Sequence, residues 1–246
     1  MKKIGNQTDS SSPDQVSPLV AGFQINSFID YPGKIAAVLF LGGCNLRCYY
    51  CHNHGILSGE SNVQPLDEIL PKLREQVGFI DGVVITGGEP TLHPNVVYII
   101  TEIKRMGFLV KLDTNGTNSD LLMELVAEGM VDYVAMDVKA PLSRYHEVVG
   151  HGIDLGEVSR SIDFLIAQSK VEYMFRTTLA PILTKEDFVE LAQLVKGAKT
   201  FQLQQFVPND FSNSHPIIGL PYSEKAATEL ANSIKPHVGE ILIRGF

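Results

Sequence analysis

Three cysteines, Cys44, Cys48 and Cys51, lie within eight residues of one another in a chain of 246 residues that contains no other cysteine. The C-x3-C-x2-C spacing lets three thiolates surround one compact metal centre, and Gly42 and Gly43 before it let the backbone turn tightly. Thiolates are ligands for iron–sulfur clusters and for zinc. With three cysteine ligands, a [4Fe-4S] cluster would keep one iron available to an exogenous ligand.

Two other interpretations of the cysteines stay open on spacing alone. Zinc in a Cys3His site would need a fourth ligand, which His52 or His54 can supply. Alternatively, the three thiols are inert side chains of the core. A disulfide framework is excluded, because three cysteines are too few to form one.

Glycines and polar residues that could contact a ligand lie at the ends of short apolar runs along the rest of the chain. An arginine inside such a run is informative, because an unpaired buried charge is costly and the side chain should therefore face an anion. In chain order the candidates are Gly87, Gly88, Glu89, Asp113, Thr114, Asn115, Asp137, Lys139, Arg176 and Gln204.

The apolar runs predict buried strands, and segments with apolar residues at helical spacing separate them. Pro71 should kink the first predicted helix or mark a restart. The predicted strands are Ile35–Leu41, Gly82–Thr86, Phe108–Leu112, Val131–Met136, Val171–Leu179, Thr200–Phe206 and a short last one at Glu240–Ile243. The predicted helices contain Leu66–Leu73, Val96–Ile103, Leu121–Val126, Ile162–Ile166, Phe188–Val195 and Ala226–Ile234.

Strands that alternate with helices form parallel βαβ units. Six such units are too few for a complete eight-fold barrel, so we predict an α/β fold with a partial (β/α)6, TIM-like barrel. Ligands bind at the carboxyl ends of parallel strands, and these are the ends that carry the candidate residues. We therefore expect a single site at the mouth of the barrel.

The cysteine segment, Cys44–Cys51, resembles the cluster loop of the radical S-adenosylmethionine (radical SAM) superfamily, in which an aromatic residue, here Tyr50, precedes the third cysteine. The resemblance continues through Gly87–Pro90, Asp113–Gly116 and Asp137–Lys139, and it covers roughly residues 20–246. It implies the partial barrel of this superfamily. It also implies a [4Fe-4S] cluster held by the three cysteines, with SAM bound to the remaining iron.

The same resemblance implies roles around SAM. Gly87 and Gly88 would let the backbone approach the methionine part closely, with Glu89 near its amino group. Tyr50 and His52 would lie beside the adenine.

Further implied contacts involve the later strands. Asp113, Thr114 and Asp137 would gather around the ribose and carboxylate of SAM, or would hold a monovalent cation. Lys139 would pair with a carboxylate of SAM or of the substrate. The remaining members of the implied set are Asn115, Arg176 and Gln204.

Within the superfamily the chain is most similar to the activating enzymes of glycyl radical enzymes, because Ser27–Gly33 resembles their N-terminal signature. Overall it looks most like the longer form of the anaerobic ribonucleoside-triphosphate reductase activating protein. The implied reaction is one-electron cleavage of SAM to methionine and a 5′-deoxyadenosyl radical, which removes a hydrogen atom from a glycine of the partner enzyme. Since three cysteines leave none for an auxiliary cluster, a flavodoxin or ferredoxin would deliver the electron.

Two alternatives remain beside this function. The first is a radical SAM enzyme with a small-molecule substrate, similar to 7-carboxy-7-deazaguanine synthase. The second is a zinc-stabilised binding module that catalyses no reaction.

The composition of the chain argues against some classes of function and indicates how the chain is divided. With 20 Lys and Arg against 28 Asp and Glu, the formal charge of −8 argues against a nucleic-acid surface. No apolar run is long enough to cross a membrane, and no signal pattern is present, so we expect a cytoplasmic protein in an oxygen-poor setting. Residues 1–18 are rich in Ser, Asp, Gln and Pro and are predicted to form a disordered leader, followed by a single domain over residues 19–246.

Overall fold

The computed structural model describes residues 17–58, 63–208, 212 and 219–246. Most of the predicted leader, residues 1–16, therefore lies outside the described residues. Ser17 and Pro18 bind to the first turn of helix α2 (Leu66–Arg74). The Asp67 amide donates to Ser17 Oγ at 3.1 Å, and the Leu66 amide donates to the Pro18 carbonyl at 2.8 Å.

An eight-stranded sheet forms the centre of the structure, in the order β2-β3-β5-β6-β7-β8-β9-β10. Neighbouring strands from β3 to β10 are parallel, whereas β2 is antiparallel to β3 at one edge. The strands are β2 (Gly22–Ser27), β3 (Ala36–Leu41), β5 (Gly82–Gly87), β6 (Leu109–Thr114), β7 (Tyr133–Asp137), β8 (Glu172–Leu179), β9 (Thr200–Gln205) and β10 (Glu240–Arg244). A separate two-stranded ladder pairs β1 (Leu19–Val20) with β4 (Gln64–Pro65).

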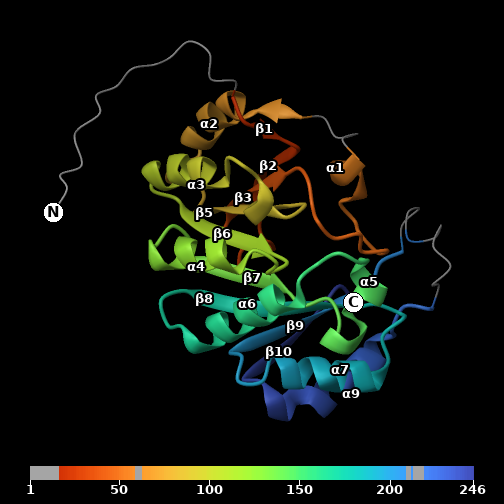
Figure 1. Ribbon diagram of the computed structural model, residues 1–246. Helices are drawn as coiled ribbons and strands as arrows, with labels where there is room; N and C mark the ends of the chain where they lie inside the picture. Colours follow the sequence, from red (N-terminus) through yellow and green to blue (C-terminus); the bar gives the residue numbers. More distant parts are fainter. Residues whose placement is uncertain (1–16, 59–62, 209–211, 213–218) are drawn as a thin grey trace.

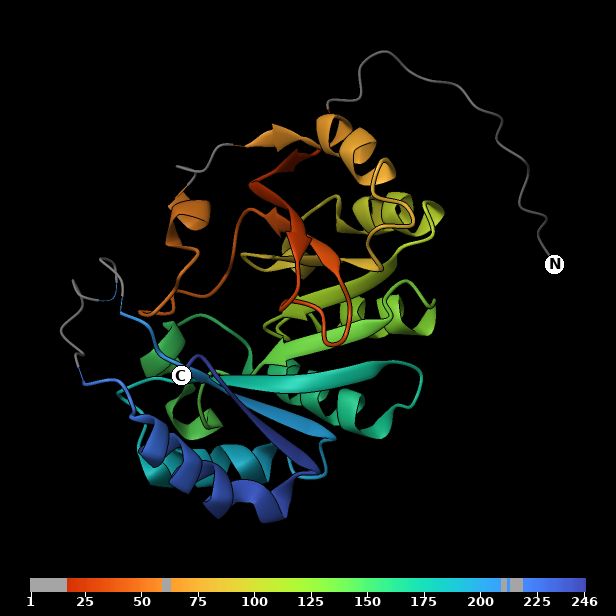
Figure 2. The same ribbon diagram turned by 180° about the vertical axis from the view of Figure 1, so that it is seen from behind.

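Helices follow most strands and cover the outer face of the curved sheet (Figure 1). Seen from behind, β2 lies toward one end of the sheet and β10 toward the other (Figure 2). Besides α2, the helices are α1 (His54–Ser58), α3 (Val96–Arg105), α4 (Ser119–Ala127), α5 (Tyr145–Val149), α6 (Leu155–Ala167), α7 (Lys185–Leu194) and α9 (Glu224–Ile234). Short 3-10 turns occupy Pro90–Leu92, Leu142–Arg144 and Lys235–His237.

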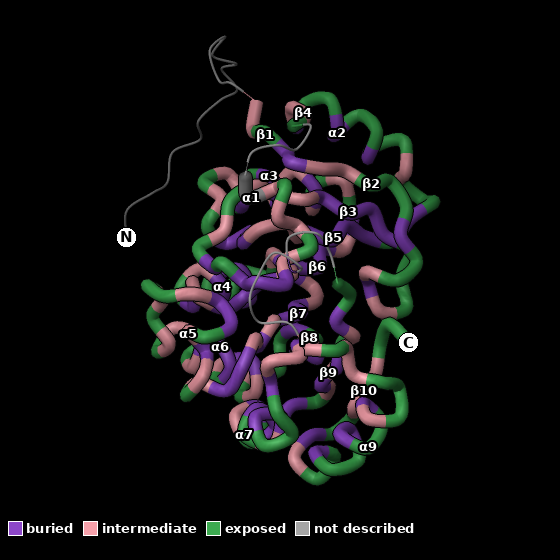
Figure 3. The backbone as a smooth tube through the Cα atoms, turned by 90° about the vertical axis from the view of Figure 1, so that its right-hand side faces the viewer, coloured by how far each residue is buried: buried purple, intermediate pink, exposed green. Residues whose placement is uncertain are grey.

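Along β3, β5, β6 and β7, alternate side chains enter two different apolar clusters, because successive side chains of a strand point to opposite faces of the sheet. The outer side chains, such as Ile85 and Leu112, pack with helix residues such as Ile99 and Leu125 in the main core. Figure 3 shows this buried layer along the strands and the facing sides of the helices. The inner side chains form a smaller cluster of Tyr31, Ala36, Val38 and Val84, with Phe40, Leu109 and Tyr133 packed against it.

The predicted partial barrel is confirmed, and each predicted strand is present with ends within two residues of the prediction. The antiparallel strand β2 was not predicted, because its sequence GFQINS lacks a continuous apolar run and its middle residues are exposed. Helix α2 continues through Pro71 without a restart. None of the helices within the described ranges is long and apolar enough to span a membrane.

Candidate functional site

One cavity at the carboxyl ends of the strands collects the candidate residues. It has a volume of about 370 Å3, which is in the range of small-molecule sites. The cysteines, Tyr50 and His52 come from the segment after β3. The other candidates come from the carboxyl-terminal halves of β5 to β9 or the residues just beyond them. All predicted site residues line this cavity: Cys44, Cys48, Tyr50, Cys51, His52, Gly87, Gly88, Glu89, Asp113, Thr114, Asn115, Asp137, Lys139, Arg176 and Gln204.

The cysteine segment has neither helix nor strand between β3 and α1, and hydrogen bonds from neighbouring elements hold it in position. The Arg47 amide donates to the Val149 carbonyl at the end of α5 at 2.8 Å, and the Arg47 guanidinium donates to the Cys44 carbonyl at 2.7 Å. The side-chain amide of Asn53 donates to the Gly87 carbonyl at 2.8 Å. The positions of the thiols therefore depend on α5 and on the end of β5.

Gly87 and Gly88 are required by the close approach of two backbone segments. A Cβ atom on Gly88 would lie 1.9 Å from the Gly43 carbonyl oxygen, and one on Gly87 would lie 2.4 Å from the Leu41 carbonyl oxygen. Gly87 also has a φ of +120°, which L-residues rarely adopt. The Glu89 amide donates to the Gly43 carbonyl at 2.8 Å across this contact. The Gly-Gly pair thus fixes the cysteine segment against β5, whether or not a ligand is bound.

Glu89 is 1% exposed and joins the ends of β5 and β6. Its Oε1 accepts from the Thr91 amide at 3.1 Å, the Thr91 hydroxyl at 2.6 Å and the Thr114 hydroxyl at 2.7 Å, while Oε2 accepts from the Asn115 amide at 2.6 Å. Burial raises the pKa of Glu89 against the opposing effect of these hydrogen bonds. Asn115 in turn donates to Cys44 Sγ at 3.9 Å, so the β6 end also contacts the cysteine segment.

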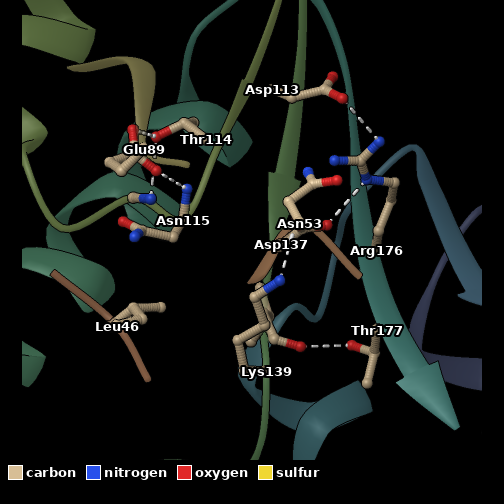
Figure 4. Close-up of polar contacts among 12 residues, drawn as sticks. Leu46, Asn53, Glu89, Asp113, Thr114, Asn115, Asp137, Lys139, Arg176 and Thr177 are labelled. Atoms are coloured by element: carbon tan, nitrogen blue, oxygen red, sulfur yellow. Dashed lines mark hydrogen bonds and ion pairs between the residues drawn. The ribbon is translucent and has the colours of Figure 1, made fainter. Parts of the chain in front are cut away.

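Five alternating charges on neighbouring strands form what we call the charge chain: Lys111, Asp113, Arg176, Asp137 and Lys139. Arg176 binds both carboxylates, through Nη1 to Asp113 Oδ2 at 3.1 Å and through Nε to Asp137 Oδ1 at 2.8 Å. Lys139 Nζ donates to Asp137 Oδ2 at 2.9 Å, and Lys111 Nζ donates to Asp113 Oδ1. Figure 4 shows the part from Asp113 to Lys139. Three cations against two acids leave one positive charge in excess.

At Asp137, Lys139 and Arg176 the ion pairs outweigh burial, whereas at Lys111 burial is the larger effect and lowers the pKa despite the Asp113 carboxylate. Burial alone would raise the pKa of Asp137, but the Arg176 and Lys139 cations outweigh it and bring that pKa down to about 2. Burial opposes the charge of Lys139 and Arg176, whereas the neighbouring carboxylates raise the pKa of both. Asp137, Lys139 and Arg176 are therefore charged at neutral pH.

The cavity walls fit a bound metal centre and a further polar group. Burial raises the pKa of the Cys48 thiol to about 12, with Lys139 acting in the opposite direction, and it also raises the pKa of Cys44 and Cys51. Such thiols lose their protons when a metal binds. The Tyr50 hydroxyl is buried on the cavity wall and has no hydrogen-bond partner among the described residues, an arrangement that a bound group can relieve.

No three His, Cys, Asp or Glu side chains among the described residues are close enough together to share one metal ion. The case for the cysteines as ligands therefore rests on their common position on the cavity wall and on thiolate chemistry.

Two of the predicted site residues, His52 and Gln204, are exposed members of the cavity lining, as a rim position requires.

The structure also adds residues that the sequence analysis did not select. Asn53 follows the motif by two residues and bonds to Gly87, a contact without any signal in the sequence. Lys111 precedes Asp113 by two residues on β6, so strand alternation places it on the same face and would have identified it.

The Gly88–Gly43 contact predicts a steric effect of Gly88→Ala. The added Cβ must move the backbone of β5 or of the cysteine segment, and strain of this kind typically costs about 1–3 kcal/mol. We expect a lower thermal unfolding midpoint by circular dichroism. Gly55→Ala in α1 is the matched control, because its Cβ would meet no atom of the described residues within 4 Å. Equal midpoints for the two variants would contradict the packing argument.

The lowered pKa of Asp137 predicts a pH-dependent stability difference. Since this pKa lies below the ordinary value of 3.8, the ionised carboxylate stabilises the folded state at neutral pH, and this contribution disappears as the pH falls through about 2. Asp137→Asn should lower the free energy of unfolding by about 2 kcal/mol near neutral pH. Urea titrations should find the deficit shrinking below about pH 4.

The exposed ion pair of Asp120 with Arg160 provides the control for this measurement. Asp120→Asn should change the free energy of unfolding by no more than about 0.5 kcal/mol at any of these pH values. A deficit for Asp137→Asn that is as large in acid as at neutral pH would show that ionisation of Asp137 is not its cause.

Comparison with known proteins gives concordant matches. Residues 38–195 match the family model of the Radical SAM superfamily. The chain is 36% identical over 232 residues to a Methanocaldococcus jannaschii protein that carries the name of a glycyl-radical enzyme activating enzyme, covering 92% of this chain and 95% of that protein. It is 30% identical over 192 residues to the pyruvate formate-lyase-activating enzyme of Clostridium pasteurianum, covering 73% and 77% of the two chains.

A solved structure agrees at the level of the fold. Streptococcus suis SuiB bound to S-adenosylmethionine superposes with a TM-score of 0.66 at 15% identity, over 82% of this chain and 48% of SuiB. The superfamily is defined by SAM chemistry at a [4Fe-4S] cluster, so these matches favour the iron–sulfur interpretation of the cysteines over zinc and over inert thiols. The chain belongs to the radical SAM superfamily and, within it, to the glycyl-radical enzyme activating enzymes.

Proposed function

We propose that this chain cleaves SAM reductively at a [4Fe-4S] cluster and generates a glycyl radical on anaerobic ribonucleoside-triphosphate reductase. The observation that carries the proposal is the convergence of three thiols and an excess positive charge on one cavity. The similarity to an activating enzyme over nearly the full length of both chains supports the activase class. The choice of reductase rests on the overall sequence resemblance.

Cys44, Cys48 and Cys51 would hold the cluster. A cluster held there would supply the one-electron chemistry for cleaving SAM and thereby for removing a hydrogen atom from the glycine of the partner enzyme. The chain's own residues bind, orient and shield the reactants. Asn115 and the backbone of Leu46 contact Cys44 Sγ, at 3.9 and 3.4 Å, and so orient this ligand.

Lys139 is the residue we assign to the SAM carboxylate. It is the charged end of the charge chain, and its positive charge acts on Cys44, Cys48 and Cys51. One of its three N–H donors binds Asp137, and the side chain lines the cavity. An anionic group beside the cysteines would therefore contact the Lys139 ammonium, which Asp137 already holds in place.

Other residues would complete the SAM site. Glu89 Oε2 accepts a hydrogen bond from the Asn115 backbone amide and retains a lone pair that would accept one from the amino group of SAM. The buried Tyr50 and the exposed His52 line the side of the cavity proposed for the adenine. Thr114 and the rim residue Gln204 would contact the ribose.

The electron would come from a separate protein. All three cysteines of the chain are assigned to one cluster, so no cysteine remains for an auxiliary cluster. A flavodoxin or ferredoxin is the proposed donor. Because an iron with an exchangeable ligand is sensitive to oxygen, we propose that the enzyme works in an oxygen-poor cytoplasm.

Electron paramagnetic resonance after anaerobic reconstitution with iron and sulfide tests the function. With SAM, a strong reductant and anaerobic ribonucleoside-triphosphate reductase, we expect a glycine-centred doublet together with 5′-deoxyadenosine. Cys48→Ser should lose the cluster and both products, because a hydroxyl is a poor ligand for this iron. A full cluster in Cys48→Ser would contradict the ligand set.

The remaining outcomes separate the alternatives. A doublet only on a different glycyl radical enzyme would correct the partner and keep the activity. Formation of 5′-deoxyadenosine without a doublet on any candidate would favour a small-molecule substrate such as that of 7-carboxy-7-deazaguanine synthase. Stoichiometric zinc without 5′-deoxyadenosine would contradict radical SAM chemistry here.

Lys139→Met tests the proposed carboxylate contact. Loss of one charge-assisted hydrogen bond should raise the KM for SAM by roughly tenfold or more. Lys225→Met is the control, since the Lys225 side chain is 87% exposed on α9, away from the cavity lining. Steady-state 5′-deoxyadenosine formation gives both values. An unchanged KM in a folded Lys139→Met protein would remove Lys139 from the site.

A further inference from the structure

Lys111 is a buried cation that the proposed reaction does not use. Its side chain is 2% exposed, and it lies on the inner face of β6 between Val84 of β5 and Tyr133 of β7. Val84 belongs to the small inner apolar cluster, and Tyr133 packs against it. An ammonium in such surroundings is costly unless a charged partner compensates it. The partner is Asp113, two residues further along the same strand.

Asp113 is compensated on both oxygens by side chains of this protein. Oδ1 accepts from Lys111, and Oδ2 accepts from Arg176 at 3.1 Å. The second acid, Asp137, is likewise bound on both oxygens, by Arg176 at 2.8 Å and by Lys139 at 2.9 Å. All four carboxylate oxygens at this edge of the cavity thus have a basic partner.

We infer that the Lys111 ammonium acts as an internal cation that holds Asp113 in place, so that the acids of the charge chain require no potassium or sodium ion. Lys111 does not line the cavity itself, and Asp113 lies between its ammonium and the cavity. It is therefore a positioning residue, which acts through Asp113 and Arg176. A free monovalent cation at Asp113 would have to displace an ammonium that is tethered to the same strand.

The charge balance supports the same conclusion. Without Lys111, the remaining four members of the charge chain sum to zero, and Asp113 Oδ1 loses its partner. A small cation from solution would then be the natural replacement, because carboxylate oxygens are hard ligands. The inference thus predicts that removal of Lys111 creates a requirement for potassium or ammonium ions that the wild type lacks.

Lys111→Met tests the inference, because methionine keeps an unbranched chain of similar size without the charge. Lys104→Met is the matched control: Lys104 on α3 binds Asp132 at 2.8 Å, with 31% of its side chain exposed, away from the cavity. The reconstituted proteins are compared in potassium, ammonium and choline chloride at equal ionic strength. The readouts are the thermal unfolding midpoint and the rate of 5′-deoxyadenosine formation without a partner enzyme.

In the wild type we expect midpoints within about 1 °C and rates within about twofold across the three salts. In choline, Lys111→Met should unfold at least roughly 5 °C below the wild type. Potassium or ammonium should restore most of that loss and raise the rate. Lys104→Met should show a small, equal loss in every salt.

Two results would overturn the inference: a wild type that needs potassium for its midpoint or rate, or a folded Lys111→Met protein that responds equally to all three salts. If Lys111→Met does not fold in any salt, the midpoint and rate of the wild type with and without potassium still test the inference. The inference rests on the proposed function only for the rate. The midpoint tests it separately, so a failure to form a glycyl radical would overturn the proposed function and leave this result standing.

Discussion

The pairing of Asp113 and Asp137 with Arg176 is the interaction on which the rest of the site depends. Arg176 on β8 binds an acid on each of the two preceding strands, so its guanidinium connects β6, β7 and β8 at their carboxyl ends. Buried charges are tolerated only when their partners are in place. The parallel register that sets Asp137 opposite Arg176 is therefore a condition for a stable cavity as well as for its polarity.

A second constraint follows from the way the cysteine segment is supported. Because this segment lacks regular structure, its shape is determined by contacts with the rest of the barrel. The Gly88–Gly43 approach fixes its beginning, the Arg47 bond to α5 fixes its middle, and the Asn53 bond to Gly87 fixes its end. The carboxyl end of β5 and the end of α5 thus organise the thiols before any metal binds, which reduces the entropic cost of ordering them.

Local patterns predicted the strands, the barrel and the cavity lining because each depends on residues close together in sequence. Apolar runs located the strands, and the carboxyl-end rule then grouped residues as distant as Cys44 and Gln204. The sequence analysis also predicted that Arg176 faces an anion, but the identity of that anion depends on strand register, which no single sequence displays. Lys111 was overlooked because β6 was predicted to end at Leu112. Asp113, the ion-pair partner of Lys111, therefore fell outside the predicted strand, and the two were not recognised as neighbours on one face.

The inner apolar cluster and the charge chain together make the cavity electrostatically asymmetric, with the positive charge on the side of the cysteines. Val84 of the cluster and Tyr133 flank Lys111 on the neighbouring strands, and its ammonium is compensated by Asp113, two residues nearer the carboxyl end of β6. From there the charges alternate across β6, β8 and β7 and finish at Lys139, beside the cysteines. An alternating row of fixed charges that begins and ends with a cation presents positive charge at its free end. The charge chain therefore places its one excess positive charge, at Lys139, in the part of the cavity where the thiols lie.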